Sequence, residues 1–309
     1  MALLVRLLLL LLLLSLPHII TTLSLTYSLA TGKTSGRRLS FVIGRHCSKE
    51  GEDDDVHHHL LNTPTLSRLA YAAIRTGRVV QLHGRTLCLR TEFVLPAGAT
   101  LTIHGPGTIV SDCHTLFKLS RNRSCLNLQD CNVTHLSSST RLLQRELGGA
   151  IFALGKSHVQ LRNCTITSEL GYGLWLVQRS VASLSTCRIE NCGRSGIVCF
   201  GHARLNLINT TIDNCALHGI CTRGNTNVSL VNCTITNSGV RGIYAYHNAT
   251  LSLQRSTIEG TLDVMAAAVQ IEALRSEDFA TLLMDNESVI RNNRGEDLKV
   301  SGRVNRKMI

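Results

Sequence analysis

A repeat of 23 residues is the feature that most constrains how this chain folds. Five isoleucines stand 23 residues apart, and a leucine stands five positions before each of them. Seven positions after four of these isoleucines comes a glycine, followed by an apolar residue. Because the offsets hold without a slip, the pattern predicts one structural unit per repeat. The isoleucines are Ile166, Ile189, Ile212, Ile235 and Ile258, and the glycines are Gly173, Gly196, Gly219 and Gly242.

Each copy contains three short runs in which apolar and polar residues alternate, separated by polar or Gly-rich corners. Such alternation is typical of strands with one buried face. Three strands per repeat match one turn of a parallel β-helix, in which successive turns stack ~4.8 Å apart. Asn191, Asn214 and Asn237 stand two positions after the repeat isoleucine. We therefore expect a column of buried corner asparagines that hydrogen-bond up the stack.

The pattern extends beyond the five copies in both directions. An earlier turn is followed by an insertion at residues 137–145, and a last, irregular turn follows a second insertion at about 263–279. Counting these, we predict an all-β solenoid of about seven or eight turns. The positions that carry the extension are Ile103, Ile109, Leu126, Leu128, Cys131, Val133, Ile290, Asn292 and Leu298.

Residues 65–76 have helical apolar spacing and end at Gly77. A helix here would cap the open end of the coil, where core and strand edges are otherwise exposed. With the Val-x-Leu, Leu-Pro-x-Gly and Leu-x-Ile segments that follow up to Ile103, this run resembles the N-terminal cap of the pectate-lyase-like right-handed β-helix superfamily. The Leu-x-x-Asn-Cys-Thr-Ile-Thr segments resemble the NosD-type repeats of carbohydrate-binding and sugar-hydrolase proteins. The resemblance covers about residues 64–300 and implies a single-stranded right-handed parallel β-helix.

The N-terminus has the pattern of a secretory signal peptide. Arg6 precedes an unbroken leucine run, and Ser28-Leu29-Ala30 is a small-x-small cleavage site. The alternative is an uncleaved anchor within residues 3–25, although Pro17 shortens the span below the ~20 apolar residues that a bilayer needs. We predict a signal peptide or anchor at 1–30, a flexible linker at 31–63, the β-helix at 64–300 and a tail at 301–309. The predicted location is secreted or on the extracellular surface.

Eight Asn-x-Ser/Thr sequons fit a glycosylated secretory chain. The net charge of +11 makes an acidic partner plausible. The arginines are dispersed and no basic–aromatic motif occurs, so we expect no nucleic acid partner. The predicted N-glycosylation sites are Asn122, Asn132, Asn163, Asn209, Asn227, Asn232, Asn248 and Asn286.

Candidate catalytic residues lie on the second strand and the corner after it. Glu190 and Asp213 should face outward on adjacent turns, at about the ~5 Å separation that retaining glycosidases use. With His218 and Arg241 they could perform acid/base chemistry on an anionic sugar, although outward charges on a corner are usually solvated. The first strand's outward face has no Asp or Glu, so the calcium site that the resemblance implies lacks ligands. We expect no metal and no cofactor.

Candidate binding residues are Trp175 and Tyr244 on the third strand, with Tyr172 nearby. An outward column of Trp175, Val198, Cys221 and Tyr244 can stack on sugar rings, or it can pack under the insertion at 263–279. The leading hypothesis is a protein that binds carbohydrate, especially an acidic polysaccharide. The alternatives are a polysaccharide lyase, hydrolase or epimerase, and a structural or protein-recognition solenoid.

Cysteines recur at one inward position, where we expect small buried side chains. Cys164–Cys187 and Cys192–Cys215 lie on adjacent turns, where a disulfide is geometrically permitted but not required. The recurring residues are Cys131, Cys164, Cys187 and Cys233.

Overall fold

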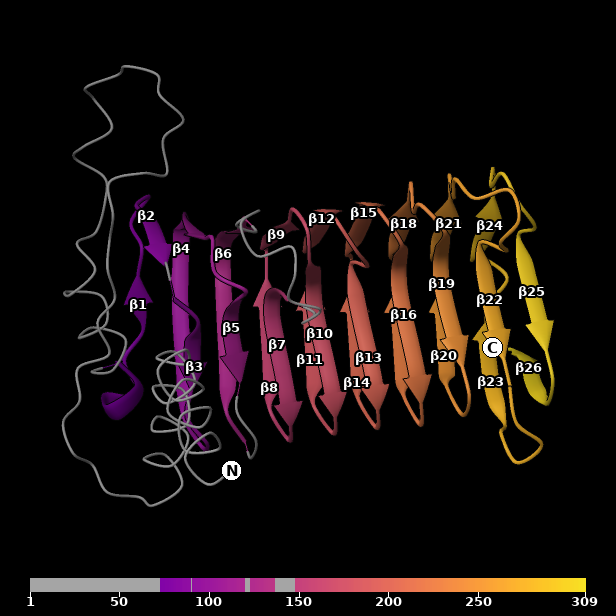
Figure 1. Cartoon of the computed structure of the whole chain (residues 1–309), viewed down its shortest axis with the longest axis horizontal. Coiled ribbons are helices and arrows are strands. Elements are labelled where there is room, and N and C mark those ends of the chain that lie inside the picture. Colours follow the sequence, from indigo (N-terminus) through magenta and orange to yellow (C-terminus); the bar gives the residue numbers. More distant parts are fainter. Residues whose placement is uncertain (1–72, 90, 120–122, 137–147) are drawn as a thin grey trace, which may run out of the picture. The chain divides into compact units, whose positions relative to one another are not determined.

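The computed structural model describes residues 73–309 apart from residues 90, 120–122 and 137–147. The predicted signal peptide or anchor, the linker, the sequon at Asn122 and the insertion at 137–145 lie outside these residues. Of the predicted capping helix only residues 73–76 are described; they are helical, and Ala73 packs into the core. The described chain forms a parallel β-solenoid whose turns follow one another along one axis (Figure 1).

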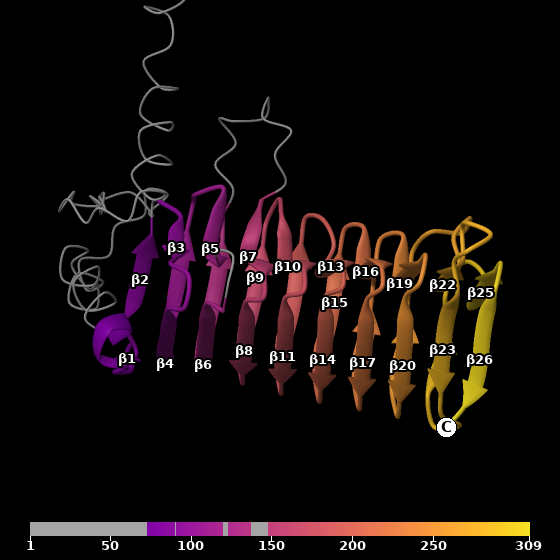
Figure 2. The ribbon, with the colours of Figure 1, turned by 90° about the horizontal axis from the view of Figure 1, so that it is seen from below.

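Each repeat contributes three strands to two parallel sheets (Figures 1 and 2). Sheet B has 9 strands, one from each turn, so the solenoid has about nine turns rather than the seven or eight expected. Its strands are β3 (Phe93–Leu95), β5 (Thr115–Leu119), β7 (Gly149–Gly155), β10 (Tyr172–Gln178), β13 (Ile197–Gly201), β16 (His218–Gly224), β19 (Arg241–Tyr246), β22 (Val269–Glu272) and β25 (Leu298–Ser301).

Sheet A has 17 strands and contains the first and second strands of each turn. In β4 and β6 the two are continuous, whereas in later turns two or more corner residues separate them. The strands are β1 (Val80–Gln81), β2 (Thr86–Leu89), β4 (Thr100–Ser111), β6 (Cys125–His135), β8 (His158–Arg162), β9 (Thr165–Ser168), β11 (Val181–Ser185), β12 (Arg188–Cys192), β14 (Arg204–Ile208), β15 (Thr211–Cys215), β17 (Asn227–Val231), β18 (Thr234–Thr236), β20 (Thr250–Gln254), β21 (Thr257–Glu259), β23 (Ala280–Met284), β24 (Val289–Arg291) and β26 (Val304–Met308).

The pairing register confirms that residues one repeat apart lie over one another. Ile166 pairs with Ile189, and Ile189 with Ile212. The same column continues through Ile235 and Ile258 to Ile290. Each repeat therefore adds one flat turn, and every column predicted from the sequence becomes a row of neighbouring side chains.

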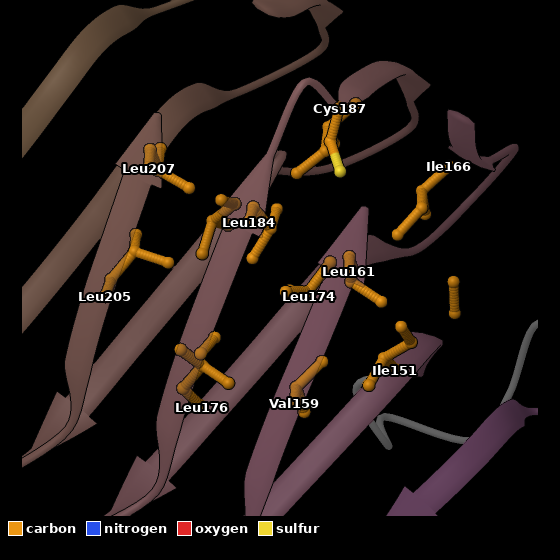
Figure 3. Packing of buried hydrophobic residues seen from close by; sticks show 14 of the residues in the cluster. Ile151, Val159, Leu161, Ile166, Leu174, Leu176, Leu184, Cys187, Leu205 and Leu207 are labelled. Atoms are coloured by element: carbon orange, nitrogen blue, oxygen red, sulfur yellow. The ribbon is translucent and has the colours of Figure 1, made fainter. Parts of the chain in front are cut away.

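The core is a continuous column of aliphatic side chains inside the coil. Figure 3 shows Leu174 and Leu176 of sheet B directed toward Val159 and Leu161 of sheet A, and all four are at most 1% exposed. Burying each such side chain stabilises the fold by about 1.5–3 kcal/mol. Because every turn repeats the same contacts, stability is distributed along the solenoid.

Steric crowding between adjacent turns explains why glycine recurs at this position of the repeat. A Cβ added at Gly219 would lie 2.5 Å from Cγ2 of Ile235 and 2.7 Å from the carbonyl oxygen of Gly242 on the next turn. Real Cβ atoms do not approach other heavy atoms this closely. Sheet B can therefore close onto the corner of the next turn only where this residue has no side chain.

The corner asparagines are exposed, so the expectation that they are buried was wrong. Asn191, Asn214 and Asn237 have φ of 52°, 50° and 51°, in the left-handed region that asparagine tolerates better than most residues. Asn214 Nδ2 donates to Asn191 Oδ1 at 2.7 Å, but Asn237 Nδ2 donates to Asp213 Oδ1 at 2.9 Å. The expected ladder is thus partly formed, and the sharp corner is the main reason for asparagine here.

The two C-terminal segments differ from the sequence expectation. Residues 263–279 contain β22, whose Val269 pairs with Ile243 of β19, so this segment continues sheet B and does not cover it. Val269 and Ile271 are fully buried in the core, while Leu262 and Val264 are 44% and 63% exposed. Val304–Met308, predicted as part of a tail, forms β26 and pairs with β23.

The recurring cysteines are buried, as predicted. Cys131, Cys164, Cys187 and Cys233 are at most 4% exposed, and the buried Thr210 and Ser256 occupy the same position in two other turns. Cys192 and Cys215 pair in register on β12 and β15. The cysteines from Cys125 to Cys233 are free thiols.

Candidate functional site

The outer surface of sheet B gathers aromatic side chains. The chain has 6 Phe, 5 Tyr and 1 Trp, and half of these lie on this one surface, which we call the aromatic face. Each is half-buried; five of them alternate with core residues along their strands, and Tyr172 begins β10 beside Trp175. The aromatic face consists of Phe152, Tyr172, Trp175, Phe200, Tyr244 and Tyr246.

Strand register produces this clustering. Phe152 of β7 pairs with Trp175 of β10, and the same column continues through Val198 and Cys221 to Tyr244 of β19. A second column, two residues further along each strand, runs through Val177, Phe200, Arg223 and Tyr246. Since side chains two apart on a strand share one face, the two columns form a single surface across five turns.

The rings contact one another in two groups. The Trp175 ring lies 4.9 Å from Phe152 in an edge-to-face arrangement and 5.7 Å from Tyr172. At the other end, Tyr244 stacks on Tyr246 at 4.8 Å, and the His218 ring lies 5.6 Å from Tyr244. Such contacts hold each ring in place and leave its outer side available for stacking.

Three arginines lie over tyrosine rings of the aromatic face. The Arg241 guanidinium lies 4.6 Å from the ring centroid of Tyr244. Arg194 lies 5.7 Å from the ring centroid of Tyr172, and Arg223 lies 5.7 Å from that of Tyr246. Arg241 Nε also donates to Gln270 Oε1 at 2.6 Å, which fixes the guanidinium. These cations add positive charge to the aromatic face, and the Glu272 carboxylate, in register with Tyr246, lies at its C-terminal end.

Burial and charge set the protonation states at the C-terminal end of the face. Burial, together with the Arg241 charge, lowers the pKa of His218 to about 4, and His218 Nδ1 has no partner within the described structure. Burial raises the pKa of Tyr244 to about 12, helped by its hydrogen bond of 2.8 Å to the carboxylate of Glu272. At neutral pH both side chains are therefore uncharged.

The predicted carboxylate pair is present. Glu190 of β12 and Asp213 of β15 occupy the same register position on adjacent turns. Arg188 forms ion pairs with both, to Glu190 Oε2 and, at 3.3 Å, to Asp213 Oδ2. Burial alone would raise the pKa of Asp213, but hydrogen bonds from Thr236 and Asn237 and the Arg188 charge together lower it.

The four predicted catalytic residues divide between the two sheets. Glu190 and Asp213 belong to sheet A, whereas His218 and Arg241 pair with each other in sheet B. Among the described residues, no hydrogen bond or ion pair joins the first pair to the second. A catalytic role for these residues stays a prediction.

An open groove of about 540 Å³ follows the second strands and the corner beyond them. Its lining is mostly apolar, with Thr134, Thr167 and Glu169 and the corner amides among it, and it contains none of the predicted binding residues. The buried His135 forms its wall, with Nδ1 bonded to Ser168 Oγ at 2.8 Å and Nε2 to the carbonyl of Cys113 at 2.7 Å. These bonds make His135 a structural residue.

Most predicted glycosylation sites are accessible. Asn132, Asn163, Asn209, Asn227, Asn232 and Asn286 are exposed. Asn248 is half-buried, and its Oδ1 accepts a hydrogen bond of 2.6 Å from the backbone of Phe279. Glycosylation itself stays a prediction.

The described part of the chain offers neither a metal site nor a membrane-spanning helix. Within the described ranges, no three His, Cys, Asp or Glu side chains are grouped so that they could hold a metal ion. No helix of the described part is both long and apolar enough to span a bilayer.

Sequence reasoning placed Trp175 and Tyr244 in one outward column and named Tyr172 as a binding residue, but it missed the second column. Phe200 and Tyr246 stand eleven residues after a repeat isoleucine, and Val177 and Arg223 occupy the same phase. Period-two alternation from Trp175 would have identified this column. Phe152 escaped notice because it follows the insertion, where the 23-residue spacing is interrupted.

A family model described as "Right handed beta helix region" matches residues 116–276, which is just over half of the chain. No curated protein and no solved structure matched the chain.

Proposed function

Since the chain belongs to the right-handed beta helix family, we propose that it uses the outer face of its coil to bind carbohydrate, with the aromatic face as the binding surface. The observation that carries this proposal is the gathering of six aromatic side chains on one sheet of an otherwise aromatic-poor chain. Ring faces of Trp and Tyr pack against the apolar faces of sugar rings.

The geometry suits an extended ligand. The aromatic columns cross five turns at ~4.8 Å per turn, so the platform is about 20 Å long. Its rings are held by neighbours and so lose little freedom on binding. Arg194, Arg223 and Arg241 over the tyrosines favour an acidic sugar.

Binding is favoured over catalysis by the state of the carboxylates. A general acid must be held protonated near neutral pH, but the lowered pKa of Asp213 keeps it ionised. Glu190 is likewise paired with Arg188. The proposed partner is therefore a carbohydrate outside the cell, with no nucleic acid partner and no cofactor.

The test is retention on an array of neutral, uronate and sulfated glycans. Trp175→Ala removes the central ring, and Ser229→Ala, on the outer face of sheet A, serves as the matched control. We expect Trp175→Ala to weaken binding at least about 30-fold, the loss typical of an aromatic hot spot worth ~2 kcal/mol or more. Equal retention of wild type and Trp175→Ala, or no retention of wild type on any glycan, would refute the proposal.

The alternative enzyme function has its own assay. Reducing-end and unsaturated-uronate measurements on pooled polysaccharides would detect a hydrolase or lyase. Turnover that is lost in Glu190→Gln/Asp213→Asn would favour this alternative. A purified chain that retains no glycan but captures a defined protein would favour the third hypothesis, a recognition solenoid.

Secretion is part of the same proposal. Mass spectrometry of the mature N-terminus should place it at Thr31, after Ala30. An intact Met1 on a membrane-bound protein would instead support the anchor.

A further inference from the structure

A row of basic side chains follows the corner between sheet B and the next first strand. At this corner four consecutive turns carry an exposed cation or histidine, and two further basic residues begin the first strands. All six side chains are exposed, and we call them the basic edge. They are Arg123, Lys156, His158, Arg179, His202 and Arg204.

The row is fixed by strand register. Lys156, Arg179 and His202 stand one repeat apart, and His158 and Arg204 both pair with Val181 of β11. Arg123 stands two residues before Cys125, which pairs with His158, so it occupies the position of Lys156 one turn earlier. Four turns at ~4.8 Å give a row about 14 Å long.

The corner backbone is rigid. Arg179 N donates to the carbonyl of Gly155 at 2.9 Å, and His202 N donates to the carbonyl of Gln178 at 2.6 Å. Directly beneath, Ser157, Ser180 and Ala203 are fully buried. The cations therefore project from a preorganised scaffold and not from a loose loop.

The charges of the basic edge are unneutralised within the described structure. No carboxylate there forms an ion pair with Arg123, Lys156, Arg179 or Arg204, whereas Arg188, Arg291 and Lys118 each pair with an acidic side chain. No Asp or Glu occurs in residues 155–160, 178–183 or 201–206. Like charges on adjacent turns repel one another, and a bound anion removes this repulsion.

The basic edge adjoins the aromatic face. Phe200 of the aromatic face is followed by Gly201 and then His202, and Val177 is separated from Arg179 only by Gln178. Arg223, over Tyr246, continues the positive charge onto the aromatic face itself. One ligand can therefore contact rings and cations at the same time.

We propose that the basic edge binds the sulfate or carboxylate groups of a linear polyanionic glycan whose sugar rings lie on the aromatic face. This inference rests on the proposed carbohydrate binding and specifies its ligand class. A single narrow row of cations beside a ring platform fits one extended chain better than a bilayer, which would contact a broad surface. The predicted secretory route and the sequons favour an extracellular polyanion over a nucleic acid.

The experiment measures binding of the secreted protein to immobilised heparin across a salt titration. Lys156→Gln/Arg179→Gln/Arg204→Gln removes three charges from the basic edge. The control Arg303→Gln/Arg306→Gln/Lys307→Gln removes three exposed charges at and beside β26, and Trp175→Ala removes the platform. Because each substituted cation is exposed, melting temperatures should stay near that of wild type, which checks folding.

We expect the basic-edge variant to bind heparin at least about tenfold more weakly than wild type, since each exposed charge contact contributes a factor of about two to five. The control should change binding less than twofold, and salt should weaken wild type more steeply than the basic-edge variant. Heparin that is both desulfated and carboxyl-reduced has no anionic groups, and it should bind wild type and the basic-edge variant with similar, low affinity.

The outcomes separate the two proposals. If Trp175→Ala weakens binding but the basic-edge variant matches the control, the basic edge is not a binding site and carbohydrate binding stands. If the basic-edge variant weakens binding but Trp175→Ala does not, the joint site is refuted together with the aromatic face as its platform. Competition by oligothymidylate or by phosphatidylserine vesicles as strong as that by free heparin would also overturn the inference.

Discussion

Gly219→Ala should destabilise the solenoid through a single methyl group. The added Cβ would meet Ile235 Cγ2 at 2.5 Å and the Gly242 carbonyl at 2.7 Å, which lie on the next turn, so the two turns must separate locally. Overpacking of this kind costs about 1–3 kcal/mol. For a β-helix of this size, about 2–4 °C of melting temperature per kcal/mol gives a decrease of roughly 2–12 °C.

Thermal unfolding followed by circular dichroism measures this decrease, with Ser229→Ala as a control on the outer surface. Ile235→Leu removes the Cγ2 methyl that the new Cβ would strike. We therefore expect Gly219→Ala to be less destabilising in the Ile235→Leu background than in wild type. An unchanged melting temperature for Gly219→Ala would refute the close approach of sheet B to the next turn.

Three further predictions concern the corners, pH and the thiols. Asn214→Gly should leave stability within a few tenths of a kcal/mol, whereas Asn214→Val should lose about 1–2 kcal/mol at a φ of 50°; equal melting temperatures would contradict this. His218 has a pKa of about 4 in the folded chain, which is below its value in the unfolded chain. The unfolded state therefore binds more protons between these two values, and the free energy of unfolding falls as the pH drops from about 6.5 to 4. His218→Phe should remove up to about 3 kcal/mol of this acid sensitivity in denaturant titrations, and an identical pH profile would contradict it. Burial raises the pKa of Cys199, so in pulsed alkylation the half-buried Cys113, Cys125 and Cys221 should react before Cys192 and Cys199; uniform labelling would show that the core is open.

The solenoid was predictable because one period governs every level of the fold. Ile166, Ile189 and Ile212 share a phase in the sequence and the same register position in sheet A. Alternation then assigned each neighbour to the core or the surface, which is why Trp175 and Tyr244 were expected in one column.

Expectations were wrong where the period is interrupted or where a residue has two possible roles. Residues 263–279 read as an insertion because Val269 follows Ile243 by 26 residues and not by 23, yet β22 keeps the register of sheet B. Asn214 was expected inside because a polar ladder can satisfy buried amides. A corner residue with left-handed backbone dihedral angles also favours asparagine, and at this corner the side chain of Asn214 is exposed to solvent.

The site was only partly predictable because its features depend on side-chain geometry. The sequence placed Glu190 and Asp213 on adjacent turns, but it did not reveal that Arg188 pairs with both. The basic edge was missed because its residues occupy two different positions of the repeat, so that they read as dispersed arginines in the sequence. In the structure both positions lie at the same corner.

Oxidative footprinting of the aromatic side chains, with and without a bound acidic glycan, tests the central claim most directly. We predict that the ligand protects Trp175, Tyr172, Phe200 and Tyr244, while Met308, which is 65% exposed on β26 of sheet A, stays equally reactive. Protection of Met308 with Trp175 unchanged would contradict the account, because the ligand would then occupy another surface of the coil.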